Sequence, residues 1–504
     1  MAIRISGFYT GLDIDQLVRD LMQARRAPLD RLLQKKTLIE WQREQYREAN
    51  AKLVDFRNNK LFNFGLEANI KARKAIVTGD ASAVSAKALA GANAGSLTIK
   101  VKTLATAATA KSSGTVSDSA KKKLTELSYL DPETNEVTTL PVDTGKNTIT
   151  IQINDVSISV EKDATIEDLV SAINASDAGV EAFFDEVSGR MSLTAKKTGA
   201  GAISLSQEFE KVFRLTDKTN GQSAELEING ISTTRDSNTF TVNGVEITLY
   251  GAGTVNIQIG SDVDKIVETI KSFINEYNAV VDYLNKKLSE ERFRNYAPLT
   301  SAQKEEMTEK EIELWEEKAK SGLLRRDSTL TTLLNDMRLA LYTAVDVGGG
   351  TISLHQLGIE TGTWEQKGKL VIKDEAKLRA AIEADPDKVA ALFTQLSSAT
   401  DEKVKKSPTN PDSGLFQRLS NAIMTALDQL ATKAGTSRYS ADTNVSFNPS
   451  SLMGEELRQL ELRIAQMNQR LTQIELRYYK QFTAMEVAVN RFNAQSGSLS
   501  SFWS

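Results

Sequence analysis

The sequence predicts an α+β multidomain protein with long α-helical termini of the coiled-coil type, a helical leg domain and inserted β-rich head domains. Three observations support this fold class. The chain has 504 residues, which is too long for a single core. Apolar residues recur at helical spacing near both ends. From about Ala75 to Gly260 the pattern changes to period-two alternation interrupted by turn-forming residues.

The first helical stretch is expected to run from Asp13 to about Phe64. Asp13 suits the N-cap position because Gln16 stands three residues later. Pro28 fits the first turn of a second helix, so a break is expected near Ala27. Apolar residues share one face before the break (Ile14, Leu17, Val18 and Leu21) and lie seven apart after it (Leu32, Ile39, Tyr46 and Leu53). This half-formed heptad seam is typical of a helix that needs a partner in an assembly.

The middle of the chain is expected to hold short strands joined by tight turns. Asn154-Asp155 separates two alternating runs, and Asn243-Gly244 joins two others with the residue pair that type I′ turns favour. One helix interrupts these strands between Thr165 and Asn174, with Thr165 as its N-cap. The region is therefore predicted to be β-rich with one short helix.

Helices are expected to return after Ser261. A segment through Leu288 carries the apolar stripe Ile266, Ile270, Phe273, Ile274, Tyr277, Val281 and Leu284. The most regular pattern lies near the C-terminus, where one helix from Gly454 to Asn493 would span roughly 60 Å. Its heptad stripe is Leu457, Leu460, Ile464, Met467, Leu471, Ile474, Tyr478 and Met485. These eight residues, together with Leu32, Ile39, Tyr46 and Leu53, are the predicted assembly contacts.

Changes in pattern also suggest domain boundaries. The expected domains are a terminal helical region (1–44 and 455–504), a mainly helical leg domain (45–75 and 261–454), a β-rich head domain (76–111 and 222–260) and an outer β-rich domain (112–221).

Composition excludes several classes of function. A net charge of −4 argues against nucleic acid as a partner, and no apolar run is long enough for membrane insertion. The absence of cysteine removes disulfides, thiolate metal sites and cysteine nucleophiles. The single histidine, His355, lies in an apolar stretch that is more typical of a structural residue than of a catalyst. We therefore expect no catalytic residues, cofactor or metal, and we expect Lys121–Lys123 and Arg325-Arg326 to be isolated basic clusters on solvated faces.

Several motifs, in order along the chain, resemble those of flagellar cap proteins, the hook-associated protein 2 or FliD family. They are Ile5-Ser-Gly-Phe-Tyr-Thr-Gly-Leu-Asp, Ala24-Arg-Arg-Ala-Pro-Leu-Asp, Leu324-Arg-Arg-Asp-Ser-Thr-Leu and Phe482-Thr-Ala-Met-Glu. The segment that begins at Thr165-Ile-Glu-Asp-Leu-Val is similar to a small motif shared by flagellins and hook-associated proteins.

The resemblance implies a non-enzymatic, extracellular protein at the tip of the flagellar filament, exported by the flagellar secretion system without a cleaved signal peptide. The implied partners are further copies of the chain in a ring, expected to be a pentamer, together with flagellin, the export apparatus and an export chaperone. We expect residues 1 to about 40 and about 455 to 504 to be mobile in the free protein and ordered in the assembled cap. The alternatives are an adhesin that binds glycans, a hook–filament junction protein or filament subunit, and an unrecognised hydrolase; the scarcity of aromatic residues in the β region disfavours a sugar-stacking platform.

Overall fold

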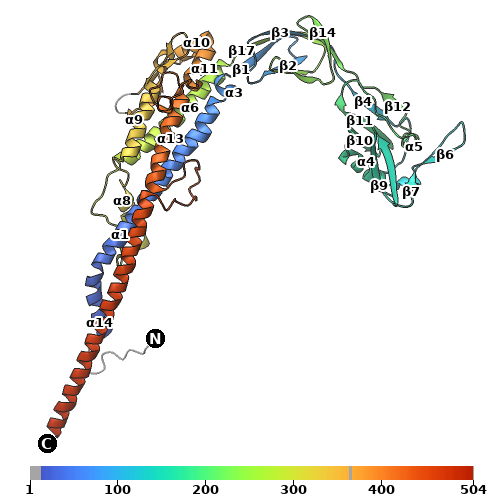
Figure 1. Ribbon diagram of the computed structural model, residues 1–504. Helices are drawn as coiled ribbons and strands as arrows, with labels where there is room; N and C mark the ends of the chain where they lie inside the picture. Colours follow the sequence, from blue (N-terminus) through green and yellow to red (C-terminus); the bar gives the residue numbers. More distant parts are fainter. Residues whose placement is uncertain (1–12, 363–365, 503–504) are drawn as a thin grey trace. The chain divides into compact units, whose positions relative to one another are not determined.

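The computed structural model describes residues 13–362 and 366–502, and the chain divides into two compact units (Figure 1). The helical unit comprises the chain up to Ile70 and from Val263 onward, and the β unit comprises Lys71–Asp262. The predicted fold class is confirmed, since long helices open and close the described chain and strands fill the middle. The opening motif from Ile5 to Leu12 lies outside the described residues.

The helical unit contains two long helices, several shorter ones and two small β-ribbons. Its elements are α1 (Ile14–Asp55), a π-helical turn (Phe56–Leu61), α2 (Phe62–Gly65), α3 (Glu67–Ile70), α6 (Val263–Ser289), α7 (Ser301–Glu305), α8 (Glu309–Lys320), α9 (Ser328–Tyr342), β18 (Val345–Asp346), β19 (Thr351–Ile352), a 3-10 turn (Leu354–Leu357), β20 (Ile359–Thr361), β21 (Leu370–Ile372), α10 (Glu375–Ala384), α11 (Pro386–Thr394), α12 (Glu402–Lys406), α13 (Leu415–Ala434) and α14 (Leu452–Phe502).

The core of the helical unit is built around α6. All seven residues of its predicted apolar stripe are buried, so that part of the sequence prediction is confirmed. Phe273 lies at the centre of an aromatic cluster, with ring centroids 6.0 Å from Phe393 and 5.0 Å from Phe416. Aromatic pairs at these separations add packing energy to their burial. The cluster therefore ties α6 to α11 and α13.

The expected break near Ala27 is wrong, because α1 continues through Pro28 as a single helix. A proline inside a helix removes one backbone hydrogen bond and normally bends or ends the helix. Here Met22 and Leu29, one on each side of Pro28, are both buried in the same apolar cluster with Leu471 of α14. Packing against α14 on both sides of the proline offsets the lost hydrogen bond. The N-cap prediction is confirmed, since Asp13 accepts a hydrogen bond from the Gln16 N–H.

A buried arginine fastens α9 to α13. The Arg418 side chain is fully buried, and its guanidinium donates hydrogen bonds to the carbonyls of Ala340, Thr343 and Ala344 at 3.1, 2.5 and 2.9 Å. A further bond reaches the Asn410 carbonyl at 2.7 Å. Burial lowers the pKa of Arg418 to about 10. Because the last carbonyls of a helix have no partner within the helix, this guanidinium serves as the C-terminal cap of α9.

The β unit contains two separate apolar cores. The first lies between a five-stranded sheet in the order β1-β17-β3-β13-β14 and a three-stranded sheet in the order β15-β16-β2. These strands are β1 (Arg73–Gly79), β2 (Val84–Ala88), β3 (Gly95–Thr103), β13 (Ala224–Ile228), β14 (Ile231–Arg235), β15 (Thr239–Val242), β16 (Val245–Leu249) and β17 (Gly253–Ser261). Both ends of the β unit thus contribute to one inner domain.

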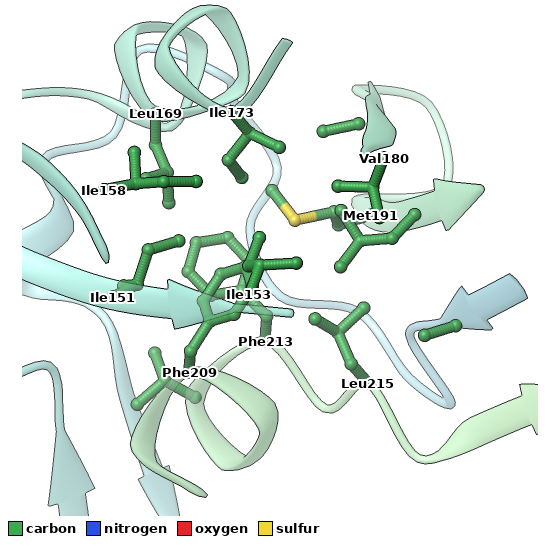
Figure 2. Close-up of a cluster of buried hydrophobic side chains, with 14 of the residues drawn as sticks. Ile151, Ile153, Ile158, Leu169, Ile173, Val180, Met191, Phe209, Phe213 and Leu215 are labelled. Atoms are coloured by element: carbon green, nitrogen blue, oxygen red, sulfur yellow. The ribbon is translucent and has the colours of Figure 1, made fainter. Parts of the chain in front are cut away.

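The second core is formed by the residues between β3 and β13 (Figure 2). Its elements are β4 (Ala107–Lys111), β5 (Ser128–Leu130), β6 (Val137–Thr139), β7 (Val142–Asp143), β8 (Thr148–Ile153), β9 (Val156–Glu161), α4 (Ile166–Ala175), β10 (Val180–Asp185), β11 (Arg190–Thr198), α5 (Gln207–Val212) and β12 (Asp217–Thr219), with a 3-10 turn at Leu124–Glu126. Side chains from α4, α5 and the strands, including Leu169, Phe209 and Ile153, point into one cluster (Figure 2). The predicted capping box is present, because Thr165 and Asp168 bond each other's backbone.

Strand β4 departs from the sequence prediction, which put it in the inner β domain. It pairs with β11 and β12, and it buries Ala108 and Ala110 in the outer core. The expected boundary after Lys111 is therefore about five residues too late. An alternation of small residues indicates a strand, but it does not indicate which sheet the strand joins. The division into four domains stays a prediction.

Both predicted hairpin turns are confirmed. Asn154 and Asp155 have φ of 47° and 63° between the paired strands β8 and β9. Asn243 and Gly244 have φ of 51° and 77° between β15 and β16. Positive φ at both central residues is what a type I′ turn requires.

Candidate functional site

The first and last helices, α1 and α14, lie side by side (Figure 1), and apolar side chains line their contact. We call this contact the terminal seam. Its buried members are Ile14, Val18, Met22, Leu29 and Leu471, and its partly buried members are Ile464, Met467, Ile474, Tyr478, Tyr479 and Phe482. The seam therefore joins two segments that lie at opposite ends of the sequence.

Polar contacts fix the direction in which the two helices pair. Lys36 forms an ion pair with Glu461 at 2.9 Å, and this hydrogen bond raises the pKa of Lys36. At the other end of the seam, the Tyr479 hydroxyl donates to Asp15 at 2.8 Å. Because earlier residues of α1 meet later residues of α14, the pair is antiparallel. Exposed contacts of this kind add little stability, but they select the register of the helices.

The predicted stripe on α14 lies on one side of the helix, with burial that falls toward the C-terminal end. Leu457, Leu460 and Leu471 are buried, whereas Ile464, Met467, Ile474 and Tyr478 are partly buried. Met485 is 36% exposed. The role of these residues in assembly stays a prediction.

The four predicted residues of α1 separate into two environments. Leu32 is partly buried and Ile39 is buried, but Tyr46 and Leu53 lie deeper in the core of the helical unit. We expected Leu32, Ile39 and Tyr46 to face α14, yet much of that surface comes from Met22 and Leu29, together with Ile14 and Val18. Ile14, Val18, Met22 and Leu29 recur at helical spacing. The expected break at Ala27 concealed that they form one continuous face of α1.

The start of α14 is anchored by two arginines of α1. The Arg43 guanidinium donates to the carbonyls of Ala434 at 2.6 Å and Asn448 at 2.9 Å, and burial lowers its pKa. The guanidinium carbons of Arg43 and Arg47 lie 4.1 and 3.7 Å from the centre of the Phe447 ring. Cation–π contacts and the two hydrogen bonds hold the segment before α14 against α1. This anchor sets where α14 begins.

A buried polar network joins α1, α9 and α13. The Tyr46 hydroxyl donates to Asp327 at 2.6 Å, and Lys433 pairs with the same carboxylate at 2.6 Å. Asp327 also caps α9 by accepting from the Leu330 N–H at 3.1 Å. Burial would raise the pKa of Asp327, but the hydrogen bonds from Lys433, Tyr46 and Leu330 outweigh it, so the pKa is lowered. The network holds the part of α1 that carries Tyr46 rigidly within the helical unit.

The described ranges, 13–362 and 366–502, include His355, the single histidine of the chain. Within them no three His, Asp or Glu side chains are grouped so as to hold a metal ion. His355 is 75% exposed, rather than enclosed by apolar neighbours, and its Nδ1 lies 3.2 Å from Glu360. In the same ranges, no helix is both long enough and apolar enough to span a bilayer.

These features define a class: helical-ended chains whose terminal helices pair antiparallel and whose middle carries inserted β domains. Family models match most of the sequence. Flagellar hook-associated protein 2 N-terminus matches residues 10–108, the Flagellin hook IN motif matches 143–197, and Flagellar hook-associated protein 2 C-terminus matches 221–494. The match to the Flagellin hook IN motif includes Thr165, where the segment that resembles a flagellin motif begins.

Individual relatives agree with these matches. The chain is 34% identical to flagellar hook-associated protein 2 of Halalkalibacterium halodurans, over 99% of this chain and 100% of that protein. It is 30% identical to the Thermotoga maritima protein of the same name, over 69% of this chain and 54% of that protein. The crystal structure of the D1-D2-D3 domains of the Escherichia coli flagellar cap protein FliD has a similar fold, with a TM-score of 0.50, 20% identity, and coverage of 78% of this chain and 96% of that one. The chain therefore belongs to the flagellar hook-associated protein 2 family, the FliD family of flagellar cap proteins.

Proposed function

We propose that this chain caps the distal end of the bacterial flagellar filament as a ring of its own copies, expected to be a pentamer. In that position it promotes the folding and insertion of exported flagellin and prevents its loss. Its partners are flagellin, the flagellar export apparatus and an export chaperone, and its role is structural rather than enzymatic. Family membership supports this function, and the terminal seam is the observation that suggests how it works.

The seam is suited to contacts that open and close. Its apolar side chains are partly exposed along much of α14, and the helix continues beyond it with Met485, Val487 and Phe492 exposed at 36%, 57% and 69%. Exposed apolar side chains gathered on one helix favour a protein partner. A two-helix contact also has little surrounding structure to stabilise it, so its opening costs less than global unfolding.

We infer that the terminal segments open and close in the free protein and become ordered when copies assemble on a filament. Each incoming flagellin then displaces a contact that is remade once the subunit is in place. Mobility of residues 1 to about 40 and about 455 to 504 is the condition for this mechanism. A filament-tip location, outside the cell, follows from the same proposal.

The test is a charge placed in the seam. In a flagellated strain that lacks its own cap protein, the full chain with Ile464→Asp and Leu471→Asp should fail to cap, so that unpolymerised flagellin appears in the medium. The matched control is Leu462→Asp with Leu476→Asp, because those leucines are 50% and 48% exposed on the same helix. The control should cap filaments, and both variants should keep a folded β unit.

Two outcomes would contradict the proposal. If the seam variant caps as well as the unchanged chain, the terminal seam has no part in the function. If labelled chain is found at the base of the filament, next to the hook, the chain is a hook–filament junction protein instead.

A further inference from the structure

The sequence suggested that the basic pair Arg325 and Arg326 is isolated, but the structure places other cationic residues beside it. Both side chains line a hollow of about 620 Å³ that we call the basic pocket. Lys35 of α1 and the pair Arg292 and Arg294, in the connection after α6, line the same hollow. Three segments far apart in the sequence thus bring five cationic residues together in a chain whose net charge is −4.

Two of these cations already have partners. Lys35 forms an ion pair with Glu456 at 2.7 Å. Arg292 donates to the carbonyls of Ala319 and Ser321 at 2.6 and 3.1 Å, and burial, followed by the nearby charge of Arg294, lowers the pKa of Arg292. These bonds hold the wall of the pocket in place.

The other three cations remain available. Within the described ranges, none of the ion pairs involves Arg294, Arg325 or Arg326, and all three side chains are exposed. Glu290 lies near the pocket and accepts a hydrogen bond from the Gly322 N–H at 3.3 Å. The cationic side chains that line the pocket repel one another, so an anionic partner would be bound favourably.

Arg326, which lines the pocket, adopts an unfavourable backbone conformation. Its φ is 56°, in the left-handed region that costs a residue with a Cβ roughly 1 kcal/mol. Glycine would avoid this cost, but it would remove one of the cations of the pocket. Residues kept in unfavourable backbone conformations are frequent at binding sites.

An acidic surface that complements the pocket lies on the same unit. Glu305, Glu306 and Glu309, at the turn between α7 and α8, are exposed, and none of them takes part in an ion pair within the described ranges. We call these three residues the acidic edge. The pocket lies at the other end of α8, beyond Ser321. A helix of 12 residues is about 18 Å long, so α8 separates Glu309, at its first turn, from the part of the pocket beyond Ser321.

We propose that, in the assembled cap, the basic pocket of one copy binds the acidic edge of the next copy. The proposal rests on the ring described under the proposed function. In a closed ring each copy offers one surface and receives a different one, and a pocket with a separate complementary edge meets that requirement. Charge complementarity would also select the order in which neighbours dock.

A charge exchange tests the proposal. Arg294→Glu with Arg325→Glu reverses the pocket, and Glu305→Lys with Glu306→Lys reverses the acidic edge. Sedimentation velocity of each purified full-length variant should show ring formation weakened by about tenfold or more. A chain carrying all four substitutions should recover assembly to within about threefold of the unchanged chain, since its charges are again complementary.

The matched control is Lys121→Glu with Lys122→Glu, which makes the same change in net charge in the outer β domain and should assemble normally. Circular dichroism checks that every variant is folded. If the pocket variant assembles like the unchanged chain, the pocket does not bind the acidic edge. The same conclusion follows if the chain with all four substitutions does not recover assembly. If the unchanged chain itself forms no ring, the failure lies in the proposed function.

Cross-linking gives a second readout that does not depend on affinity. The natural chain has no cysteine, so any disulfide must come from introduced residues. Arg325→Cys with Glu305→Cys should give a ladder of covalent multimers on a non-reducing gel after mild oxidation. The pair Lys121→Cys with Glu305→Cys should give none, and equal ladders from both pairs would contradict the proposed contact.

Discussion

Replacing Leu471 by alanine removes the most buried side chain that α14 contributes to the terminal seam. Leu471 is 6% exposed and belongs to the same cluster as Met22 and Leu29 of α1. Large-to-small substitutions in a core cost about 2 to 5 kcal/mol. The seam is two helices wide and its partly buried neighbours can collapse into the gap, so we expect about 2 kcal/mol, the low end of that range. This corresponds to an increase of roughly 30-fold in the opening equilibrium of the seam.

Hydrogen exchange of the full-length chain, followed by mass spectrometry at low protein concentration, measures that opening. Amides of residues 464–478 should exchange roughly 30-fold faster in Leu471→Ala, provided that closing is faster than exchange. Leu476→Ala is the matched control, because Leu476 lies on the same helix and is 48% exposed. It should change exchange by less than about threefold. Equal effects of the two substitutions would refute the seam, and full protection of α14 in the unchanged monomer would refute its opening and closing.

Three further predictions concern the helical and β units. Arg418→Met should lower the free energy of unfolding by about 3 to 5 kcal/mol in guanidinium titrations, because four carbonyls, two buried and two partly buried, lose their donor; a loss under about 1 kcal/mol would contradict the capping role. The pKa of Asp327 is lowered in the folded state, so its stabilisation is present above the unfolded pKa of about 4 and is lost as pH falls through the folded pKa. Asp327→Asn should therefore show a shallower loss of stability than the unchanged chain between about pH 5 and pH 2, and parallel curves would count against the network. Excision of residues 106–221 through a short Gly-Ser linker should leave a soluble protein in size-exclusion chromatography, whereas excision of 112–221 should aggregate because β4 loses both of its partners.

Local signals explain which parts of the fold could be predicted from the sequence. The α6 stripe, the Thr165 cap and the Asn243-Gly244 turn each depend on residues within a few positions of one another. The heptad pattern likewise identified α14 as a helix that needs a partner, and the structure supplies one in α1. Features of this kind are determined by spacing, propensity and backbone conformation alone.

Long-range contacts explain the rest. Pro28 is tolerated inside α1 because α14 packs on both sides of it, and no local rule reveals that packing. The alternating pattern of strand β4 would be the same in either sheet, so the pattern cannot show that β4 pairs with β11. Arg325 and Arg326 could not be assigned to a pocket because their neighbours, Lys35 and Arg292, are distant in sequence.

Electron cryomicroscopy of filaments grown with the purified full-length chain would show where the chain binds and whether it forms a ring. We expect a ring of copies at the distal end of each filament, with α14 ordered against α1 or against a neighbouring copy. Filament tips without added density, or density confined to the hook-proximal end, would contradict this expectation.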